Sequence, residues 1–277
     1  MCGGREEIIY KPYLDSDILR LGFKKKELLN NSVKSKKFVI QKYIEKPLLI
    51  NGRKFDIRMW ALLDHEMNVY LFKEGYLRTS ARQFTLDHNL IPDKSIHLTN
   101  NAVQKNLKNY GEYEEGNQIS LKDFQKYLDS IKSGVDVRTN LYSQMKQLVY
   151  LSLMSVKGKI NPNNRIYQFE IFGYDFIVDI NYKVWLIEVN TTPCLEESSG
   201  ILKMLLPRML FDTFSLTLDK IFGNDTGNKQ NCPFVVEGYD SKENLWEFIC
   251  EININRKNRG NRILTQNNIT FPEEEVL

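Results

Sequence analysis

The sequence predicts an α/β protein of the α+β kind, with helices packed against a mixed or antiparallel sheet. β-Rich runs at 54–64 and 68–80 flank a short polar turn, and the segment 169–194 contains two more such runs around a turn. Runs of this kind indicate β-hairpins. Apolar residues recur at helical spacing in 120–131 and 140–156, so these segments are predicted to be helices that form core faces.

The first β-rich run is 37–44, and it should end before Pro47, which cannot donate to a central ladder. In the run 54–64 the strand period of two separates two faces. The polar face suggests the wall of a site, and the alternative is an exposed sheet face crossed by weak ion pairs. The polar face comprises Lys54, Asp56, Arg58 and Trp60, and the apolar face comprises Phe55, Ile57, Met59, Ala61 and Leu63.

Residues 81–119 are polar and are predicted to form a loop. His97 lies within it, and a lone histidine is more often structural than catalytic, so its identity assigns it no role. Ser120 and Asp123 then make a capping-box pattern at the start of the next helix. The apolar stripes predicted for the two helices are Leu121, Phe124, Leu128 and Ile131, followed by Leu141, Met145, Leu148 and Met154.

The segment 169–194 predicts a hairpin whose turn lies at Asn181 and Tyr182. A two-residue loop there would pair Ile180 with Lys183. The strand period then places six apolar side chains on one face, which we assign to the core. They are Tyr174, Phe176, Val178, Trp185, Ile187 and Val189.

The opposite face of this hairpin carries a polar trio. The same register places Asp175 directly opposite Glu188, and Asn190 follows on the same face. Two adjacent carboxylates repel each other and lose hydration, which a divalent cation relieves. Oxygen ligands of this kind suit Mg²⁺, which completes its octahedron with phosphate and water. A solvated hairpin end with its acids facing water is the alternative.

The last third of the chain predicts a helix over 200–222, with Pro207 in the first turn of its main part. After residue 223 the composition shifts to Asn, Lys and Gly. The stretch 234–249 predicts one strand and a short helix, and the final residues are expected to fray.

Composition agrees with a soluble globular protein: 42% of the 277 residues are hydrophobic and 26% are charged. The net charge of +3 tolerates an acidic partner without requiring nucleic acid. Its four cysteines lie far apart without a C-x-x-C pair, which indicates neither a zinc site nor a disulfide framework and fits a reducing compartment. No apolar run approaches the roughly 18 residues of a membrane span, and no signal peptide is evident.

Six ordered blocks between about Phe38 and Ile221 resemble the tubulin-tyrosine-ligase-like family, whose members have the ATP-grasp fold. Each block alone is weakly specific, whereas their order and spacing together are highly specific. The blocks are VIQKYIEKPLLI, GRKFDIRMW, FKEGYLRTS, HLTNNAVQK, FGYDFIVD and WLIEVNTTP.

The resemblance implies a ligase that uses ATP and Mg²⁺ to add a free amino acid to protein chains, usually tubulin tails. The acceptor carboxylate is phosphorylated to an acyl phosphate, and the amine of the donor displaces phosphate. Such chemistry depends on metal, positive charge and positioning. Tubulin or microtubules are therefore the expected partners, in the cytoplasm on the cytoskeleton, with the cilium and basal body as more specific locations. Asn101-Ala102 after HLTN resembles glycine-adding more than glutamate-adding members.

The resemblance also implies roles for single residues. Adenine would be held by Gln41, Lys42, Tyr43 and Ile44. Further nucleotide contacts would come from Lys54, Asp56, Thr99 and Asn100. Magnesium would be held by Asp175, Glu188 and Asn190. Catalytic roles fall to Arg58 against the phosphates, Arg78 on the carboxylate of the incoming amino acid, and Glu188.

Three regions are predicted: a divergent or truncated remnant of the amino-terminal lobe at 1–35, a catalytic domain at 36–222, and a partly flexible extension at 223–277. Lys11-Pro12 matches the start of a phosphate-binding loop, but Leu-Asp-Ser-Asp follows in place of glycines that would let the backbone approach phosphate. The main alternative is a non-catalytic microtubule-binding or scaffold remnant. A small-molecule ATP-grasp ligase would explain the metal trio but not the KFDIR and HLTN blocks.

Overall fold

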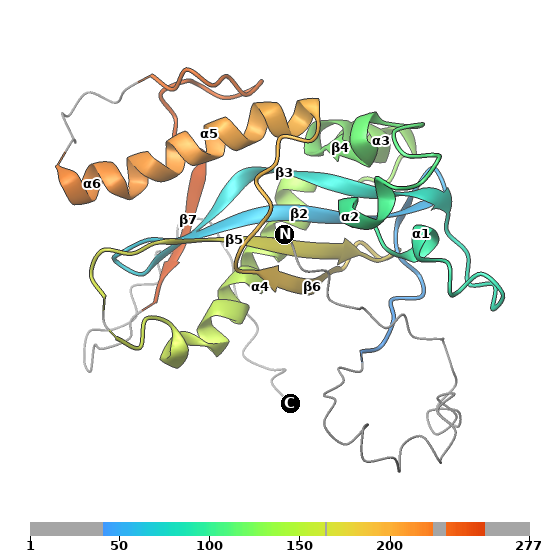
Figure 1. Cartoon of the computed structure of the whole chain (residues 1–277), viewed down its shortest axis with the longest axis horizontal. Helices are drawn as coiled ribbons and strands as arrows, with labels where there is room; N and C mark the ends of the chain where they lie inside the picture. The colour runs from blue at the N-terminus through green and yellow to red at the C-terminus, as the bar shows by residue number, and fades with distance from the viewer. Residues whose placement is uncertain (1–40, 164, 224–230, 253–277) are drawn as a thin grey trace, which may run out of the picture.

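The computed structural model describes residues 41–163, 165–223 and 231–252. Within them, seven strands form one antiparallel sheet with helices on both faces (Figure 1). The strand order is β4-β3-β2-β5-β6, while β1 pairs with β2 and β7 pairs with β3. The expected combination of helices and an antiparallel sheet is therefore confirmed.

The strands are β1 Leu49–Ile50, β2 Arg53–Leu63, β3 Asn68–Gln83, β4 Gln118–Ser120, β5 Glu170–Val178, β6 Val184–Asn190 and β7 Trp246–Glu251. The α-helices are α1 Lys94–His97, α2 Asn101–Gln104, α3 Leu121–Ser130, α4 Tyr142–Ser155, α5 Gly200–Leu216 and α6 Leu218–Phe222. Shorter helical turns lie at Glu115–Asn117, Val137–Leu141 and Lys157–Lys159.

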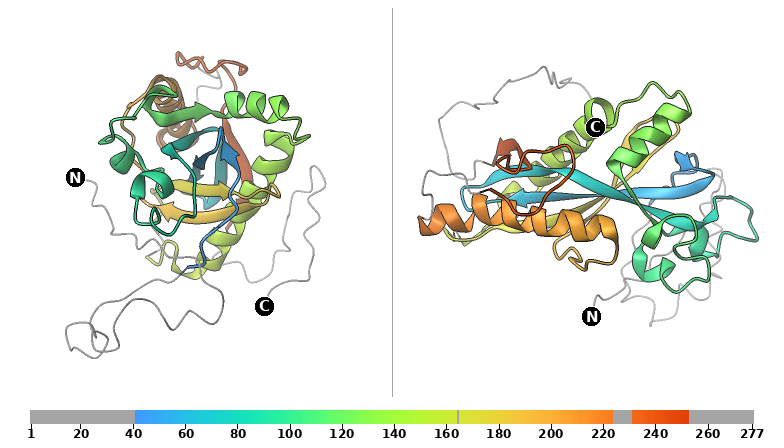
Figure 2. Two further views of the ribbon diagram at one scale, coloured as in Figure 1. Left: turned by 90° about the vertical axis from the view of Figure 1, so that its right-hand side faces the viewer. Right: turned by 90° about the horizontal axis from the view of Figure 1, so that it is seen from above.

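The two faces of the sheet carry separate hydrophobic clusters, because side chains alternate along each strand. Phe55, Ile57 and Met59 of β2 pack in one cluster with residues of α3 and α4. Trp60 and Leu62 pack in the other with residues of α5. Figure 2 shows α5 on one side of the sheet and α3 and α4 on the other. The two faces predicted for β2 are confirmed.

The predicted opposition of Asp175 and Glu188 in the β5–β6 hairpin is confirmed, but the predicted two-residue loop is wrong. The Asp179 amide donates to the Lys183 carbonyl at 3.0 Å, so three residues, 180–182, form the loop. The Asp179 carboxylate stabilises it by accepting from the Asn181 and Lys183 amides. A register shift between Asp175 and Phe176 compensates for the added residue and restores the predicted opposition.

The core assignment for β6 is wrong for three side chains. Because Val184 pairs with Val178 and Leu186 with Phe176, it is Val184 and Leu186 that turn toward the core. The exposed fractions are 37% for Trp185, 41% for Ile187 and 39% for Val189. Val189 pairs with the buried Tyr174 but lies on the last strand of the described sheet, where less of the protein covers it.

The region 81–119 is more ordered than predicted, since it contains the end of β3 together with α1, α2 and the start of β4. The capping box of α3 is confirmed: the Ser120 hydroxyl accepts from the Asp123 amide at 3.0 Å. Ile131 lies past the end of α3 and is 45% exposed, so its predicted place in the core is wrong. The corresponding stripe of α4 includes buried Met145.

The predicted helix over 200–222 consists of α5 and α6, which meet at Thr217. Pro207 lies inside α5 and not in a first turn, because Ser199 caps the helix well before it. The carbonyl of Lys203, four residues earlier, cannot receive a hydrogen bond from the proline nitrogen. Lys203 is exposed, so water can reach this part of the helix.

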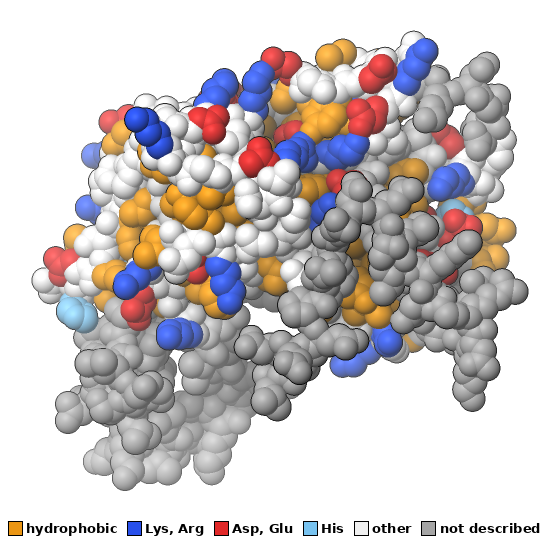
Figure 3. All heavy atoms as spheres, turned by 180° about the vertical axis from the view of Figure 1, so that it is seen from behind, with side chains coloured by type: hydrophobic (Ala, Val, Ile, Leu, Met, Phe, Trp, Pro, Cys, Tyr) orange, Lys and Arg blue, Asp and Glu red, His pale blue; other side chains and the backbone are white. Residues whose placement is uncertain are grey.

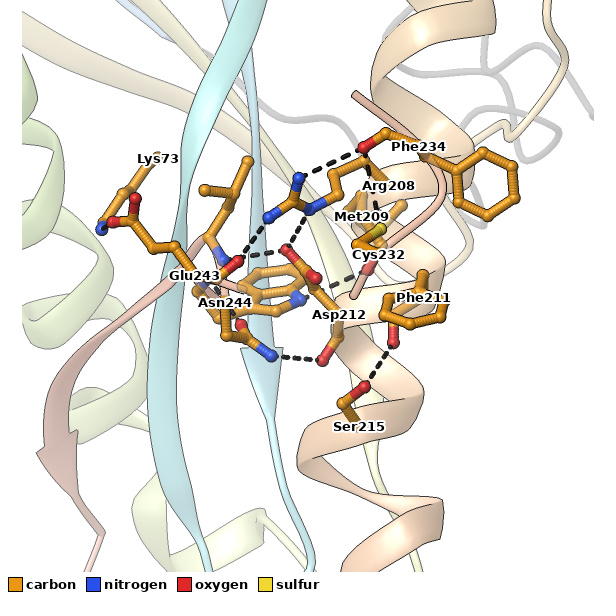
Figure 4. A network of polar contacts seen from close by, with 12 residues as sticks. Lys73, Arg208, Met209, Phe211, Asp212, Ser215, Cys232, Phe234, Glu243 and Asn244 are labelled. Carbon is orange, nitrogen blue, oxygen red and sulfur yellow. Dashed lines mark hydrogen bonds and ion pairs between the residues drawn. The ribbon is translucent and has the colours of Figure 1, made fainter. Parts of the chain in front are cut away.

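Beyond residue 222, β7 confirms the predicted strand, whereas no helix forms in 234–249. Here Arg208 of α5 donates to the carbonyls of Phe234 and Glu243 (Figure 4). It also donates to the carbonyl of Asp240. These bonds provide the three carbonyls with donors although the segment forms no helix. The strand β7 that follows pairs with β3 and so belongs to the same sheet as the earlier strands.

The predicted strand over 37–44 is only partly described. Residues 41–44 have no regular structure, and Pro47 makes a single bridge to Asp179. Residues 37–40, like the region 1–35 and Lys11-Pro12, lie outside the described residues.

The face behind the sheet carries acidic and basic side chains interspersed with separate hydrophobic groups (Figure 3). The described side chains on that face thus form no single block of one charge. None of the helices in the described ranges is both long and apolar enough to span a membrane.

Candidate functional site

A row of side chains crosses four strands on the face of the sheet that α5 covers. Tyr76 of β3 pairs with Arg58 of β2, Arg58 pairs with Asp175 of β5, and Asp175 pairs with Glu188 of β6. Paired residues in antiparallel strands place their side chains on the same face. The sheet register therefore gathers residues that are more than a hundred positions apart in the sequence.

Ion pairs join two arginines and two aspartates: two of them, Arg58 and Asp175, lie in the row, and the other two lie beside it. Arg58 donates to both carboxylate oxygens of Asp175, with 2.9 Å for the Nη2–Oδ2 pair. Arg78 holds Asp56 in a bidentate pair at 2.6 and 2.8 Å, and its Nη2 also lies 2.8 Å from Asp175 Oδ2. The Thr99 hydroxyl donates to Asp56 as well.

The set is buried: Asp56, Arg58, Arg78 and Asp175 are each at most 7% exposed. Burial alone raises the pKa of Asp175, but Arg78 and Arg58 outweigh it and lower the pKa to about 2. The pKa of each arginine is raised by its carboxylates against the opposing effect of burial. Asp175 and the two arginines are therefore charged at neutral pH. None of these bonds uses Nη1 of either arginine, so this amino group can meet an anionic ligand.

The predicted metal trio is brought together at the end of the row. Nδ2 of Asn190 lies 3.1 Å from Glu188 Oε1 and 3.4 Å from Asp175 Oδ2. Two carboxylates and an amide oxygen fit a Mg²⁺ ion that keeps water and phosphate ligands. The amide can present its oxygen after a flip, since O and N are assigned from hydrogen bonding. Among the described residues no group of three or more His, Cys, Asp or Glu side chains could hold a metal.

A second polar cluster lies beside the first, because Lys54 and Asp56 share a face of β2. Lys54 Nζ donates to the Tyr43 hydroxyl at 3.1 Å and to the His97 carbonyl at 2.9 Å. Tyr43 and His97 are themselves joined by a hydrogen bond of 2.9 Å. Thr99, two residues after His97, reaches Asp56, so one short segment contacts both clusters.

Four other predicted residues lie outside these bonded sets. Gln41 and Lys42 are exposed and Ile44 is half-buried. Asn100 is the N-cap residue of α2, although its side chain makes no capping hydrogen bond. The structure thus joins Tyr43, but not its neighbours, to the polar face of the sheet.

Sequence reasoning missed two glutamines that shape this region. Gln118 of β4 pairs with Arg78, is buried, and accepts a 2.6 Å hydrogen bond from the Ser199 hydroxyl. Gln104 is fully buried, accepts from the Ala81 amide and donates to the carbonyls of Ser95 and Leu98. The three residues of β4 are too few for a strand pattern, and Gln104 could have been found only as part of the HLTNNAVQK block.

Sequence reasoning also missed the crossing segment, residues 191–199, which links β6 to α5. It passes across the sheet in Figure 1. A Cβ added at Gly173 would lie 3.0 Å from Pro193 Cβ and 3.4 Å from the Arg58 guanidinium. At its other end, Ser199 bonds to Gln118. The crossing segment therefore lies directly over the row of charged residues.

An antiparallel sheet with helices on both faces and this charged row defines an ATP-grasp-like α/β protein. The model of the tubulin-tyrosine ligase family matches residues 8–228, and the chain belongs to this family. The match begins before Phe38, where the resemblance read from the sequence began.

Curated relatives include enzymes named for two different amino acids. The chain is 34% identical to tubulin glycylase 3B of Tetrahymena thermophila over 72% of this chain and 16% of the relative. It is 34% identical to protein monoglycylase TTLL8 of Mus musculus over 69% and 23% of the two chains. It is 40% identical to probable tubulin polyglutamylase TTLL9 of Bos taurus over 58% and 34%. In each case the chain spans well under half of the relative's length.

Proposed function

We propose that this chain is the ATP-binding part of a ligase that adds amino acids to carboxylates of protein chains, with tubulin tails as the acceptor. The observation that carries the proposal is the row of Arg58, Asp175 and Glu188 on one face of the sheet. Family membership supports ATP use, and the names of the relatives support tubulin as the acceptor. The site of action would then be the cytoskeleton in the cytoplasm, with the cilium and basal body as more specific locations.

The residues of the row and those that contact them have three tasks in this proposal. Arg58 and Arg78 present fixed positive charge, which binds and orients phosphate and carboxylate groups. Asp175, Glu188 and Asn190 would hold Mg²⁺, and bound Mg²⁺ would neutralise phosphate charge. Thr99 and Arg78 fix Asp56 between them. Because the arginines are already held by aspartates, little reorganisation is needed when charge develops on the substrate.

Glycine is the donor that we place first, and glutamate second. Asn101-Ala102 after HLTN supports this order. In the structure Asn101 Oδ1 accepts a 2.7 Å hydrogen bond from the Tyr110 hydroxyl, so its side chain has a defined orientation. Transfer assays with labelled glycine and labelled glutamate on microtubules would decide between the two donors.

Substituting Glu188→Gln tests the proposed metal-holding role. The change removes one negative charge and keeps the shape of the side chain, so transfer of labelled amino acid should fall by about a hundredfold or more. The matched control is Glu237→Gln, at an exposed glutamate that pairs with the exposed Lys122. Undiminished transfer by the Glu188 variant, with an intact far-UV circular dichroism spectrum, would defeat the assignment.

A separate measurement distinguishes a ligase from a non-catalytic remnant. Saturating ATP with Mg²⁺ should raise the melting temperature of the purified chain, since a ligand that binds only the folded state stabilises it. Nucleotide binding without transfer to any tested acceptor would favour a binding module, and absence of both would contradict the proposal.

A further inference from the structure

His97 is a buried titratable residue without a task in the proposed reaction. It is 3% exposed and is the last residue of α1. Asp93 caps this helix by accepting from the Ser95 amide at 2.9 Å, and Gln104 donates to the carbonyls on either side of His97, those of Ser95 and Leu98. The backbone of His97 is therefore held from both ends.

The imidazole ring is also enclosed by two aromatic neighbours. Its centroid lies 5.8 Å from that of Tyr43 and 5.9 Å from that of Phe84, and both contacts are edge-to-face. Tyr43 comes from the segment before β1, and Phe84 follows β3. The ring of His97 thus packs between two segments that flank the polar face of β2.

Lys54, Tyr43 and His97 are linked by hydrogen bonds whose directions can be ordered from the donors that each side chain carries. An ammonium group can only donate, so the Tyr43 hydroxyl accepts from Lys54 at 3.1 Å. The hydroxyl proton is then left to be donated to His97 Nδ1, 2.9 Å away. We take Nδ1 as the acceptor, which places the proton of the neutral ring on Nε2, a buried atom without a hydrogen-bond partner among the described residues. The direction of the chain of donors is Lys54, Tyr43, His97.

Two of the contacts of Lys54 involve Tyr43, and another involves the backbone of His97. Nζ donates to the His97 carbonyl and to the Tyr43 hydroxyl, and it lies 4.7 Å from the centroid of the Tyr43 ring. An ammonium on a flexible stem otherwise has several rotamers to choose from. The imidazole fixes Tyr43, and Tyr43 in turn fixes Lys54.

We propose that His97 is a positioning residue for nucleotide binding: in its neutral form it orients the Tyr43 hydroxyl, which sets the place of the Lys54 ammonium. The inference rests on the proposed function, since it takes Lys54 as a nucleotide contact. It adds to the ATP site a residue that acts through its neighbours. Its effect on ATP passes through Tyr43 and Lys54.

The groups around His97 determine how the positioning varies with pH. Burial lowers the pKa of His97 from its usual 6.5, and Lys54 of β2 lowers it further. Asp93 at the start of α1 and the Leu90 carbonyl act in the opposite direction. A protonated ring could no longer accept from Tyr43 and would repel Lys54. The chain should therefore bind ATP with full affinity at neutral pH. The affinity should decline at a pH below 6.5, as His97 becomes protonated at its lowered pKa.

The test is titration of the full 277-residue chain with ATP in the presence of Mg²⁺. In His97→Asn the amide oxygen can replace Nδ1 as acceptor, so affinity should stay within about twofold. In His97→Leu the volume is kept but the acceptor is lost, and affinity should fall about tenfold. Tyr43→Phe keeps both ring contacts and should give the same loss. His88→Asn, at an exposed histidine, is the control.

The double variant separates positioning from simple packing. If His97 acts through Tyr43, Tyr43→Phe combined with His97→Leu should bind no more weakly than either single variant. Additive losses of about a hundredfold, or an unchanged affinity in both single variants, would overturn the inference while leaving ATP binding established. Failure of the unmodified chain to bind ATP would overturn the proposed function as well. The decline below pH 6.5 should be absent in His97→Asn.

Discussion

Two buried arginine sets in this molecule use their hydrogen bonds in different ways. Arg208 of α5 is completely buried, and all three of its guanidinium nitrogens are bonded. They donate to Asp212 and to the carbonyls of Phe234 and Glu243 (Figure 4), and to the carbonyl of Asp240. Arg58 and Arg78 of the sheet bond to the carboxylates of Asp56 and Asp175, and their Nη1 groups make none of these bonds.

The difference shows how a structural arginine can be told from one that can bind a ligand. Arg208 donates to backbone carbonyls of a segment that forms no helix, so all of its guanidinium nitrogens are engaged within the protein. The sheet arginines pair with the side chains of Asp56 and Asp175, and these ion pairs do not use the Nη1 donor of either arginine. Burial is nearly the same in both sets, so burial alone does not identify the site.

Removal of Arg208 should have the largest effect on stability. Arg208→Met removes the ion-pair partner of buried Asp212 and the guanidinium donor of three carbonyls, which should lower the free energy of unfolding by about 3 to 5 kcal/mol. Arg58→Met should cost less, because Asp175 keeps Arg78, but should abolish ATP binding. Urea unfolding and ATP titration of both variants measure the two effects. Equal stability losses would show that the two sets do not differ in this way.

The pH dependence of stability should distinguish the aspartates of the two sets. The folded pKa of Asp175 is depressed from 3.8 to about 2, so its contribution is present above 3.8 and is lost as the pH falls through 2. The difference corresponds to about 2 kcal/mol, which Asp175→Asn should lose at neutral pH. Burial raises the pKa of Asp212 despite Arg208, so Asp212 opposes folding as it ionises above 3.8.

Urea unfolding between pH 6 and pH 2.5 measures this contrast. Asp175→Asn should flatten the acid loss of stability, whereas Asp212→Asn should make it steeper, because protonation of Asp212 in the folded state offsets part of the loss. Parallel pH profiles for the two variants would contradict the assignment of opposite signs.

The charged row was predictable from sequence to the extent that strand periodicity determines it. The opposition of Asp175 and Glu188 and the shared face of Lys54, Asp56 and Arg58 follow from a period of two, which local sequence preserves. The opposition survived an error in the loop only because the register shift compensated for the extra residue. The prediction was therefore correct for the Asp175–Glu188 pair but not for the core side chains of β6.

The errors arose where contacts between residues distant in the sequence determine the local structure. The exposure of Val189 depends on which strand is last in the sheet, and the absence of a helix in 234–249 depends on Arg208. Neither partner is close in sequence. Similarly, His97 acquires its neighbours only when the segment before β1 meets α1, so no local pattern could reveal them.

The smallest of these effects should come from Gly173, where the crossing segment (191–199) meets Arg58. A methyl group there would lie 3.0 Å from Pro193 Cβ, closer than side chains normally pack, and 3.4 Å from the Arg58 guanidinium, at the limit of ordinary contact. Gly173→Ala should thus cost about 1 kcal/mol in unfolding free energy. It should also weaken ATP binding severalfold, because displacement of Pro193 changes the packing beside Arg58. Gly158→Ala adds the same methyl group where no atom lies within 4 Å, and should change neither quantity. If both alanine variants behave alike in urea unfolding and ATP titration, the crossing segment does not hold Arg58, and the ion pairs with Asp175 suffice to place it.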